Sequence, residues 1–244
     1  MGQQITVTGM VLSAMPVGEY DKRLVILTKE RGKLSAFAKG VRRQNSPGAA
    51  ASQPFVFGTF TLYEGRTSYT MQHVEVKEYF DELRQNLEMI YYGSYFCELA
   101  EYLTREYNDE KHILLLLYQT LRTLIKKKIP ASLIRYIYEI KVMAYYGQAM
   151  EVFSCVKCGD SERLAVFDSR TGGVLCEECK NVAHSSMNVS GSTLYTLQYI
   201  LSSSIEKLYT FLVSDEVMVQ LRKIATEYRM EYIEKHFKSL DFID

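Results

Sequence analysis

Long apolar runs and the common nucleotide-binding and hydrolase motifs are missing from this chain of 244 residues. The longest purely aliphatic run is Ile113 to Leu117, far shorter than the roughly 20 residues that cross a bilayer. There is no Gly-x-x-x-x-Gly-Lys-Ser/Thr loop and no Gly-x-Ser-x-Gly elbow, and only four histidines occur. We therefore expect neither a membrane protein nor an enzyme.

The first residues, Met1-Gly-Gln-Gln, also lack the basic and apolar stretches of a secretion signal. We expect a cytoplasmic protein, whose thiols stay reduced, so that closely spaced cysteines bind metal.

The chain does contain two Cys-x-x-Cys pairs, formed by Cys155 with Cys158 and by Cys176 with Cys179. Two residues between thiolates allow one tight turn to aim both sulfurs at the same ion, and a second such turn completes a tetrahedron. The alternative is a pair of disulfides, which the spacing and the reducing compartment disfavour. Because protein fills all four positions, we predict one structural Zn²⁺ in a module spanning residues 153–182.

Residues 1–80 have the pattern of short strands separated by turns. Ile5, Val7, Gly9 and Val11 alternate with Thr6, Thr8 and Met10, and four further strand patterns follow at short spacing. Five such strands with glycine-bearing turns predict a small closed barrel, most often an OB-fold.

Charge is distributed unevenly along a chain that is neutral overall. Residues 1–80 carry ten Lys and Arg against six Asp and Glu, a net charge of +4, and the remainder carries −4. On the predicted strand that begins at Lys33, a period of two places Phe37 between Lys33 and Lys39. Cations that follow phosphates and a ring that stacks on a base are the elements of a single-strand binding groove. The other interpretation is a solvated face with Phe37 turned inward.

We favour the nucleic-acid interpretation and predict a set of contact residues in the barrel. They are Lys22, Arg23, Arg31, Lys33, Phe37, Lys39, Arg42, Arg43 and Arg66.

From Asp81 onward the hydrophobic period changes to that of helices. A stripe from Leu83 to Leu103 is followed by helical patterns that end near Lys126 and Gly147, and two more begin near Ser190 and at Ser214. The predicted fold class is therefore α+β: an OB-fold barrel (1–80), followed by an all-α bundle (81–244) into which the zinc module is inserted.

Several segments together resemble the RecO family of bacterial recombination mediators. The resemblance begins with Gly9-Met-Val-Leu, Gly18-Glu-Tyr-Asp-Lys-Arg-Leu-Val and Thr28-Lys-Glu-Arg-Gly-Lys-Leu-Ser-Ala-Phe-Ala-Lys-Gly-Val-Arg-Arg43. It continues through Leu62-Tyr-Glu-Gly, Tyr138-Glu-Ile-Lys-Val-Met-Ala-Tyr-Tyr-Gly147 and Gly172-Gly-Val-Leu-Cys176. It covers most of the chain and is weakest after about residue 190.

The resemblance implies a nucleoid-associated protein that binds single- and double-stranded DNA and anneals complementary strands. It also implies work with the RecR protein, recognition of the C-terminal tail of single-stranded-DNA-binding protein, and indirect action on RecA through its loading. Some members of the family lack the zinc cysteines, so the metal is not required for the activity in general.

A zinc-ribbon transcription or RNA-binding factor is the alternative function. It requires a basic surface on the module, but residues 155–179 hold three Lys and Arg against five Asp and Glu. This composition favours the barrel as the nucleic-acid-binding part.

Overall fold

A computed structural model describes residues 3–66, 68–184 and 186–243, and the chain divides into two compact units. The first unit comprises the residues up to Ile125 together with the C-terminal segment from Phe237, and the second comprises Lys126 to His236. The proposed division into domains at residue 80 stays a prediction.

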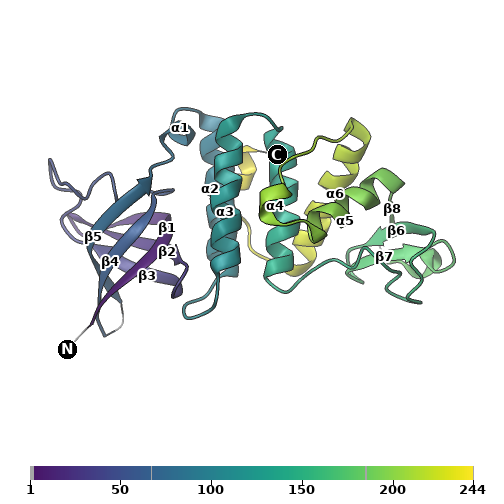
Figure 1. Ribbon diagram of the computed structural model, residues 1–244, viewed down its shortest axis with the longest axis horizontal. Helices are drawn as coiled ribbons and strands as arrows, with labels where there is room; N and C mark the ends of the chain where they lie inside the picture. The colour runs from purple at the N-terminus through teal and green to yellow at the C-terminus, as the bar shows by residue number, and fades with distance from the viewer. Residues whose placement is uncertain (1–2, 67, 185, 244) are drawn as a thin grey trace. The chain divides into compact units, whose positions relative to one another are not determined.

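The first unit contains the expected barrel (Figure 1). Its strands are β1 (Gln4–Val17), β2 (Asp21–Thr28), β3 (Gly32–Ala38), β4 (Phe57–Glu64) and β5 (Tyr69–Glu78). They close in the order β1-β2-β3-β5-β4, with β3 and β5 parallel. The predicted OB-like barrel followed by helices is therefore confirmed.

Strand β1 closes the barrel because it pairs with two neighbours along its length. Residues Gln4–Met10 pair with β4, and Gly9–Val17 pair with β2, with a shift of register after Val11. The alternation predicted for this strand is wrong at Met10, which is fully buried. Helix α2 (Leu87–Leu103) packs against β1, so part of the outer face of the strand is not exposed to solvent.

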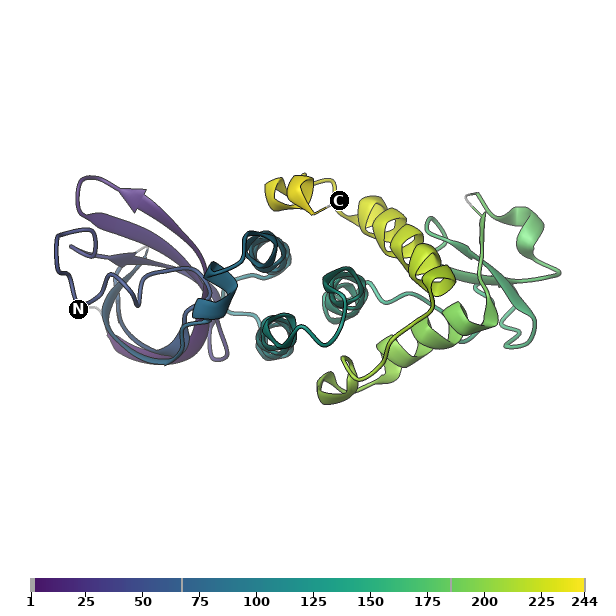
Figure 2. The ribbon, with the colours of Figure 1, turned by 90° about the horizontal axis from the view of Figure 1, so that it is seen from above.

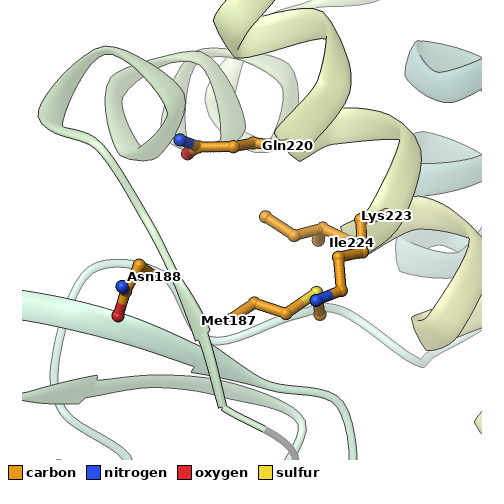
Figure 3. Close-up of a pocket in the computed structure, with 5 residues that line it drawn as sticks. All are labelled: Met187, Asn188, Gln220, Lys223 and Ile224. Carbon is orange, nitrogen blue, oxygen red and sulfur yellow. The ribbon is translucent and has the colours of Figure 1, made fainter.

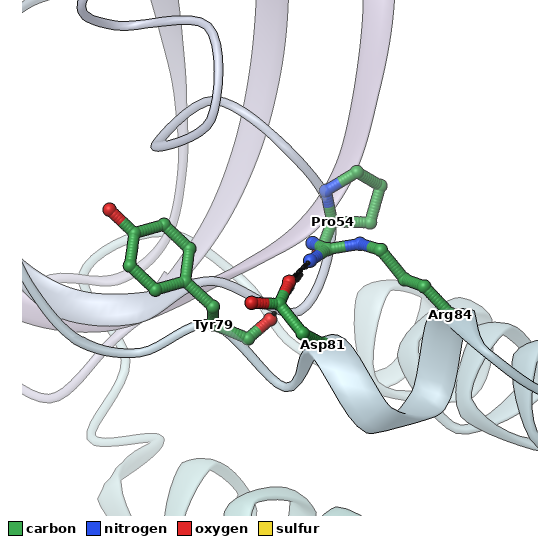
Figure 4. Close-up of polar contacts among 4 residues, drawn as sticks. All are labelled: Pro54, Tyr79, Asp81 and Arg84. Atoms are coloured by element: carbon green, nitrogen blue, oxygen red, sulfur yellow. Dashed lines mark hydrogen bonds and ion pairs between the residues drawn. The ribbon is translucent and has the colours of Figure 1, made fainter.

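The helical stripe expected from Leu83 to Leu103 is divided between α1 (Asp81–Arg84) and α2, with Asn86 as the N-cap of α2. Arg84 fixes the chain where it leaves the barrel (Figure 4). Its guanidinium donates to the Pro54 carbonyl at 2.7 Å, to the Tyr79 carbonyl at 3.2 Å and to the Asp81 carboxylate at 2.6 Å.

Helix α3 (Lys111–Lys126) follows α2, and both are seen end-on beside the barrel in Figure 2. The C-terminal segment returns to α2. Phe237 is buried edge-on against Tyr95, and Phe242 stacks on Tyr91 with ring centroids 4.4 Å apart. The Ser239 hydroxyl also donates to Glu98 at 2.8 Å.

The second unit is built on α4 (Ala131–Tyr145), α5 (Gly191–Ser202) and α6 (Asp215–Tyr232). Between α4 and α5 the chain forms a three-stranded sheet of β6 (Leu164–Asp168), β7 (Gly173–Cys176) and β8 (Ser186–Asn188). The cysteine module is thus inserted among helices, as predicted. Serines at positions 190 and 214 cap α5 and α6 by accepting from main-chain N–H groups.

Three charged side chains of α4 are buried and join it to the other helices. Glu139 accepts from Arg135 at 2.9 Å and lies 3.8 Å from Nε of Arg229 on α6. The ammonium group of Lys141 donates to the carbonyls of Ile200, Leu201 and Ser203 at 2.7–3.1 Å, at the C-terminal end of α5. Cations are stabilised there by the helix dipole.

We predict that Glu139→Ala lowers the free energy of unfolding by about 3–5 kcal/mol, because it leaves two buried guanidinium groups without their carboxylate. Glu178→Ala is the control, since its ion pair with Arg163 is exposed and such pairs contribute at most about 1 kcal/mol. Urea denaturation measures both variants. A Glu139→Ala loss no larger than the control would contradict the buried pairing.

Candidate metal centre and nucleic-acid interface

The four cysteines of the module lie in two tight turns, one before β6 and one at the end of β7. In the first turn, Gly159 donates to the Cys155 carbonyl at 2.8 Å and adopts a φ of +78°, which a glycine tolerates without strain. In the second, Cys179 donates to the Cys176 carbonyl at 3.0 Å, directly after β7. Each Cys-x-x-Cys therefore turns its two sulfurs to one side, as expected.

The sulfur atoms are arranged as a tetrahedral metal site requires. All four Sγ atoms lie within 4.8 Å of one another, and those of Cys158 and Cys176 are 3.7 Å apart. Ligands at about 2.3 Å from a tetrahedral zinc are about 3.8 Å from each other, so this spacing fits the ion. Cys155 and Cys176 are buried, and Cys158 is exposed. The cluster can hold a metal ion with protein ligands in every position.

The surroundings of the cluster favour a thiolate at one position before any metal binds. Burial opposes ionisation of Cys155, but N–H groups of Cys158, Cys176 and Lys157 outweigh it and lower the pKa of this thiol to about 6. Burial and the neighbouring thiols raise the pKa of Cys179 to about 12. A divalent cation is needed to deprotonate the whole set, so metal binding releases protons.

The module is joined to α6 through one aromatic contact. Phe167 of β6 is fully buried and meets the ring of Tyr228 edge-on, with centroids 5.9 Å apart. The buried carboxylate of Asp168 accepts from the main chain of Arg170 and His184 at 3.1 and 2.9 Å. The hairpin that carries the second cysteine pair is thus part of the core of the second unit.

A pocket of about 390 Å³ lies between β8 and α6 (Figure 3). Its lining contains Met187, Asn188, Gln220, Lys223 and Ile224. The Gln220 side chain already accepts from the Ser190 N–H at 3.0 Å. Lys223 is surrounded here by amide and apolar side chains, so this lining does not contain a pair of groups for acid–base catalysis.

The predicted DNA-contacting residues occupy different environments in the barrel. Alternation along β3 is as predicted: Leu34, Ala36 and Ala38 are buried, and Phe37 is partly exposed on the outer face. The exposed members of the set are Arg23, Lys39, Arg42, Arg43 and Arg66, and the partly buried ones are Lys22, Arg31, Lys33 and Phe37. Their role as contacts stays a prediction.

Strand pairing brings one cation to the ring on this face. Arg23 of β2 lies directly opposite Phe37 of β3, and its Nε donates to the hydroxyl of Ser35 at 2.8 Å. An exposed methionine, Met15 of β1, lies opposite Arg23 on the other side. Arg23 and Phe37 are therefore cross-strand neighbours on the outer surface formed by β1, β2 and β3.

The remaining cations fall at opposite ends of β3. Lys39, Arg42 and Arg43 follow its C-terminal end, whereas Arg31 precedes its N-terminal end. There the Tyr107 N–H donates to the Arg31 carbonyl at 2.9 Å, and the Lys33 ammonium donates to the Glu101 carbonyl of α2. These contacts tie Arg31 to the segment that joins α2 and α3, and Lys33 to the last turn of α2.

Sequence reasoning missed Tyr20 and Asp21, which belong to the C-terminal end of β3 in space. The Arg43 guanidinium lies over the Tyr20 ring, 5.1 Å from its centroid. The Asp21 carboxylate accepts from the Gly40 N–H at 2.7 Å. A tyrosine and an acid in a turn are common, so no local pattern distinguishes them.

Comparisons with known proteins identify the relatives of this chain. Family models described as "Recombination protein O N terminal" and "Recombination protein O C terminal" match residues 1–80 and 84–241. The chain belongs to the RecO family. It is 34% identical over 239 residues to the DNA repair protein RecO of Alkaliphilus metalliredigens, with 97% of each chain covered. The RecO proteins of Acetivibrio thermocellus and Bacillus pumilus are 32% and 29% identical, and 97% of this chain is covered in both comparisons.

Membership of the RecO family assigns the chain to DNA repair. Among the described helices, none combines the length and hydropathy needed to span a bilayer.

We predict that Cys176→Ser reduces the bound metal and lowers the melting temperature by at least about 5 °C, because metal binding contributes to folding. Elemental analysis and thermal denaturation measure these effects. Cys97→Ala is the control: Cys97 is buried in α2 of the first unit, so this variant should keep its full metal content. Metal-free parent protein that is unaffected by a chelator would exclude a structural ion.

Proposed function

We propose that this chain is a recombination mediator of DNA repair that acts without catalysing a covalent reaction. It binds single- and double-stranded DNA through the barrel, anneals complementary strands and, with the RecR protein, helps to load RecA onto strands covered by single-stranded-DNA-binding protein. Its place of action is chromosomal DNA in the cytoplasm. Family membership and the outer face of the barrel support this proposal.

The observation that carries the proposal is the pairing of the exposed Arg23 of β2 with the partly exposed ring of Phe37 on β3. A phosphate contact displaces condensed counterions, which gives affinity that does not depend on sequence and decreases with salt. A ring such as Phe37 stacks on any base. Contacts of this kind hold a strand extended, and the hydrogen-bonding edges of its bases stay available to a complementary strand.

In this proposal the cysteine module does not bind DNA. It binds Zn²⁺ as a structural ion. The module has an excess of acidic side chains. Four thiolates around a divalent cation add further negative charge. Phosphates are therefore repelled by this part of the second unit, which disfavours the alternative of a zinc-ribbon nucleic-acid-binding factor. The acidic surface is better suited to contacts with proteins.

Annealing of complementary strands coated with single-stranded-DNA-binding protein tests the function. We expect the parent protein to accelerate it and the double variant Arg42→Glu/Arg43→Glu to bind single strands at least about tenfold more weakly at low salt. The salt slope should decrease by about 0.7 for each lost phosphate contact.

The control is Lys157→Glu/Arg170→Glu, which makes the same change of charge at exposed positions of the module. It should retain binding and annealing. Equal losses in the two double variants would show that net charge, and not the barrel surface, governs affinity.

Phe37 provides a separate prediction. Phe37→Ala should weaken binding of single-stranded DNA by about 1–3 kcal/mol through lost stacking, with little change of the salt slope. Fluorescence anisotropy measures the affinity. Phe37→Tyr keeps the ring and should bind like the parent, and duplex affinity should change less, because paired bases are not free to stack. Unchanged affinity of Phe37→Ala would support the solvated-face interpretation.

A further inference from the structure

Two segments that are separated by β2 and β3 are joined into one cationic surface at the end of the barrel. They are the β1–β2 turn, residues 18–21, and the segment after β3, residues 39–43. The Arg42 N–H donates to the Tyr20 carbonyl at 2.9 Å, and the Arg42 guanidinium donates to the Gly18 carbonyl at 3.0 Å. Arg43 lies over the Tyr20 ring. Both arginines of the segment after β3 therefore contact the β1–β2 turn.

The cations at this end are close enough to repel one another. Desolvation and the charge of Arg42 lower the pKa of Lys22. The Lys22 ammonium also lies against the Ser52 carbonyl, at 3.4 Å. Repulsion between these cations opposes their placement side by side, so other contacts must offset it.

Asp21 is an acid within this cationic surface, where its charge alone disfavours binding of phosphates. It occupies the first position of β2, opposite Val17 of β1. Its Oδ1 accepts from the Gly40 N–H at 2.7 Å, and the Gly40 carbonyl in turn accepts from the Arg43 N–H at 3.1 Å. The carboxylate therefore holds the start of the tight turn that presents Arg42 and Arg43.

The conformation of Gly40 shows why this contact fixes the turn. Gly40 has a φ of +68°, and the next residue, Val41, is buried in the barrel core. The turn is thus fixed by its core side chain on one side and by Asp21 on the other. Without the carboxylate, the peptide of Gly40 can rotate, and the contacts of Arg42 with Gly18 and of Arg43 with Tyr20 are weakened.

We propose that Asp21 is a positioning residue of the nucleic-acid surface: it orients Arg42 and Arg43 toward successive phosphates, at the cost of adding one negative charge beside them. This inference rests on the proposed function of the barrel. An acidic side chain near DNA ordinarily weakens binding by repelling phosphates. Asp21 instead strengthens binding, because it orients the two arginines.

Three variants separate orientation from charge. Asp21→Asn removes the charge and keeps a side-chain oxygen that accepts from Gly40, whereas Asp21→Ala removes both. Glu75→Gln is the matched control, because Glu75 is an exposed acid of β5 that lies outside the surface formed by residues 18–21 and 39–43. Affinity for a labelled single-stranded oligonucleotide is measured by fluorescence anisotropy at several salt concentrations, using the full chain.

We expect Asp21→Asn and Glu75→Gln to bind as tightly as the parent or slightly more tightly. Asp21→Ala should bind about three- to tenfold more weakly, with a salt slope smaller by about 0.7, as for one lost phosphate contact on a single strand. Its Gly40 N–H should also exchange hydrogen faster. Asp21→Ala and Asp21→Asn of equal affinity would overturn the inference.

Asp21→Glu decides the question where Asp21→Ala fails to fold, since it keeps the charge but moves the acceptor by one methylene group. It should bind more weakly than the parent, and parent-like affinity would again overturn the inference. Failure of the proposed function looks different. In that case the parent does not bind, or Arg42→Glu/Arg43→Glu binds like the parent, whatever the Asp21 variants do.

Discussion

Closure of the barrel by β1 is the constraint on which the rest of the first unit depends. One strand pairs with β4 through its first half and with β2 through its second, so the sheet has no free edge and a single inside. Every strand then has one inner and one outer face. Inner positions such as Leu34 and Ala36 form the core, and outer positions such as Phe37 are partly exposed. A slip of one residue in β3 would exchange the two sets.

The surface at the end of the barrel depends on contacts that cross between segments. Arginines on a flexible loop attract phosphates, but they lose conformational entropy when they bind. Here the guanidinium of Arg42 is held by a carbonyl and that of Arg43 by a ring, so part of this entropy is already lost in the free protein. Under the function proposed above, preorganisation of this kind reduces the entropic cost of binding phosphates.

In the second unit, buried charges link the helices to one another, and packing links them to the hairpin that carries the second cysteine pair. Glu139 links α4 to α6, and Lys141 links α4 to the end of α5. The hairpin reaches the same helices through Phe167 and Tyr228. Because these residues share one core, the cysteine cluster is connected to the helices by packing and not only by the chain.

The barrel class, the helical second half and the cysteine cluster can be predicted from the order of residues alone. Each rests on a local signal: a period of two, a period near 3.6, or a short ligand spacing. The set of cations that share a surface could not be predicted in this way, because it depends on which strand ends lie together in the folded chain. The fold supplied this information. It separated Arg31 from Arg42, brought Tyr20 and Asp21 to the arginines, and placed Phe237 on α2. These contacts join residues distant in the chain, and no local pattern of side chains specifies them.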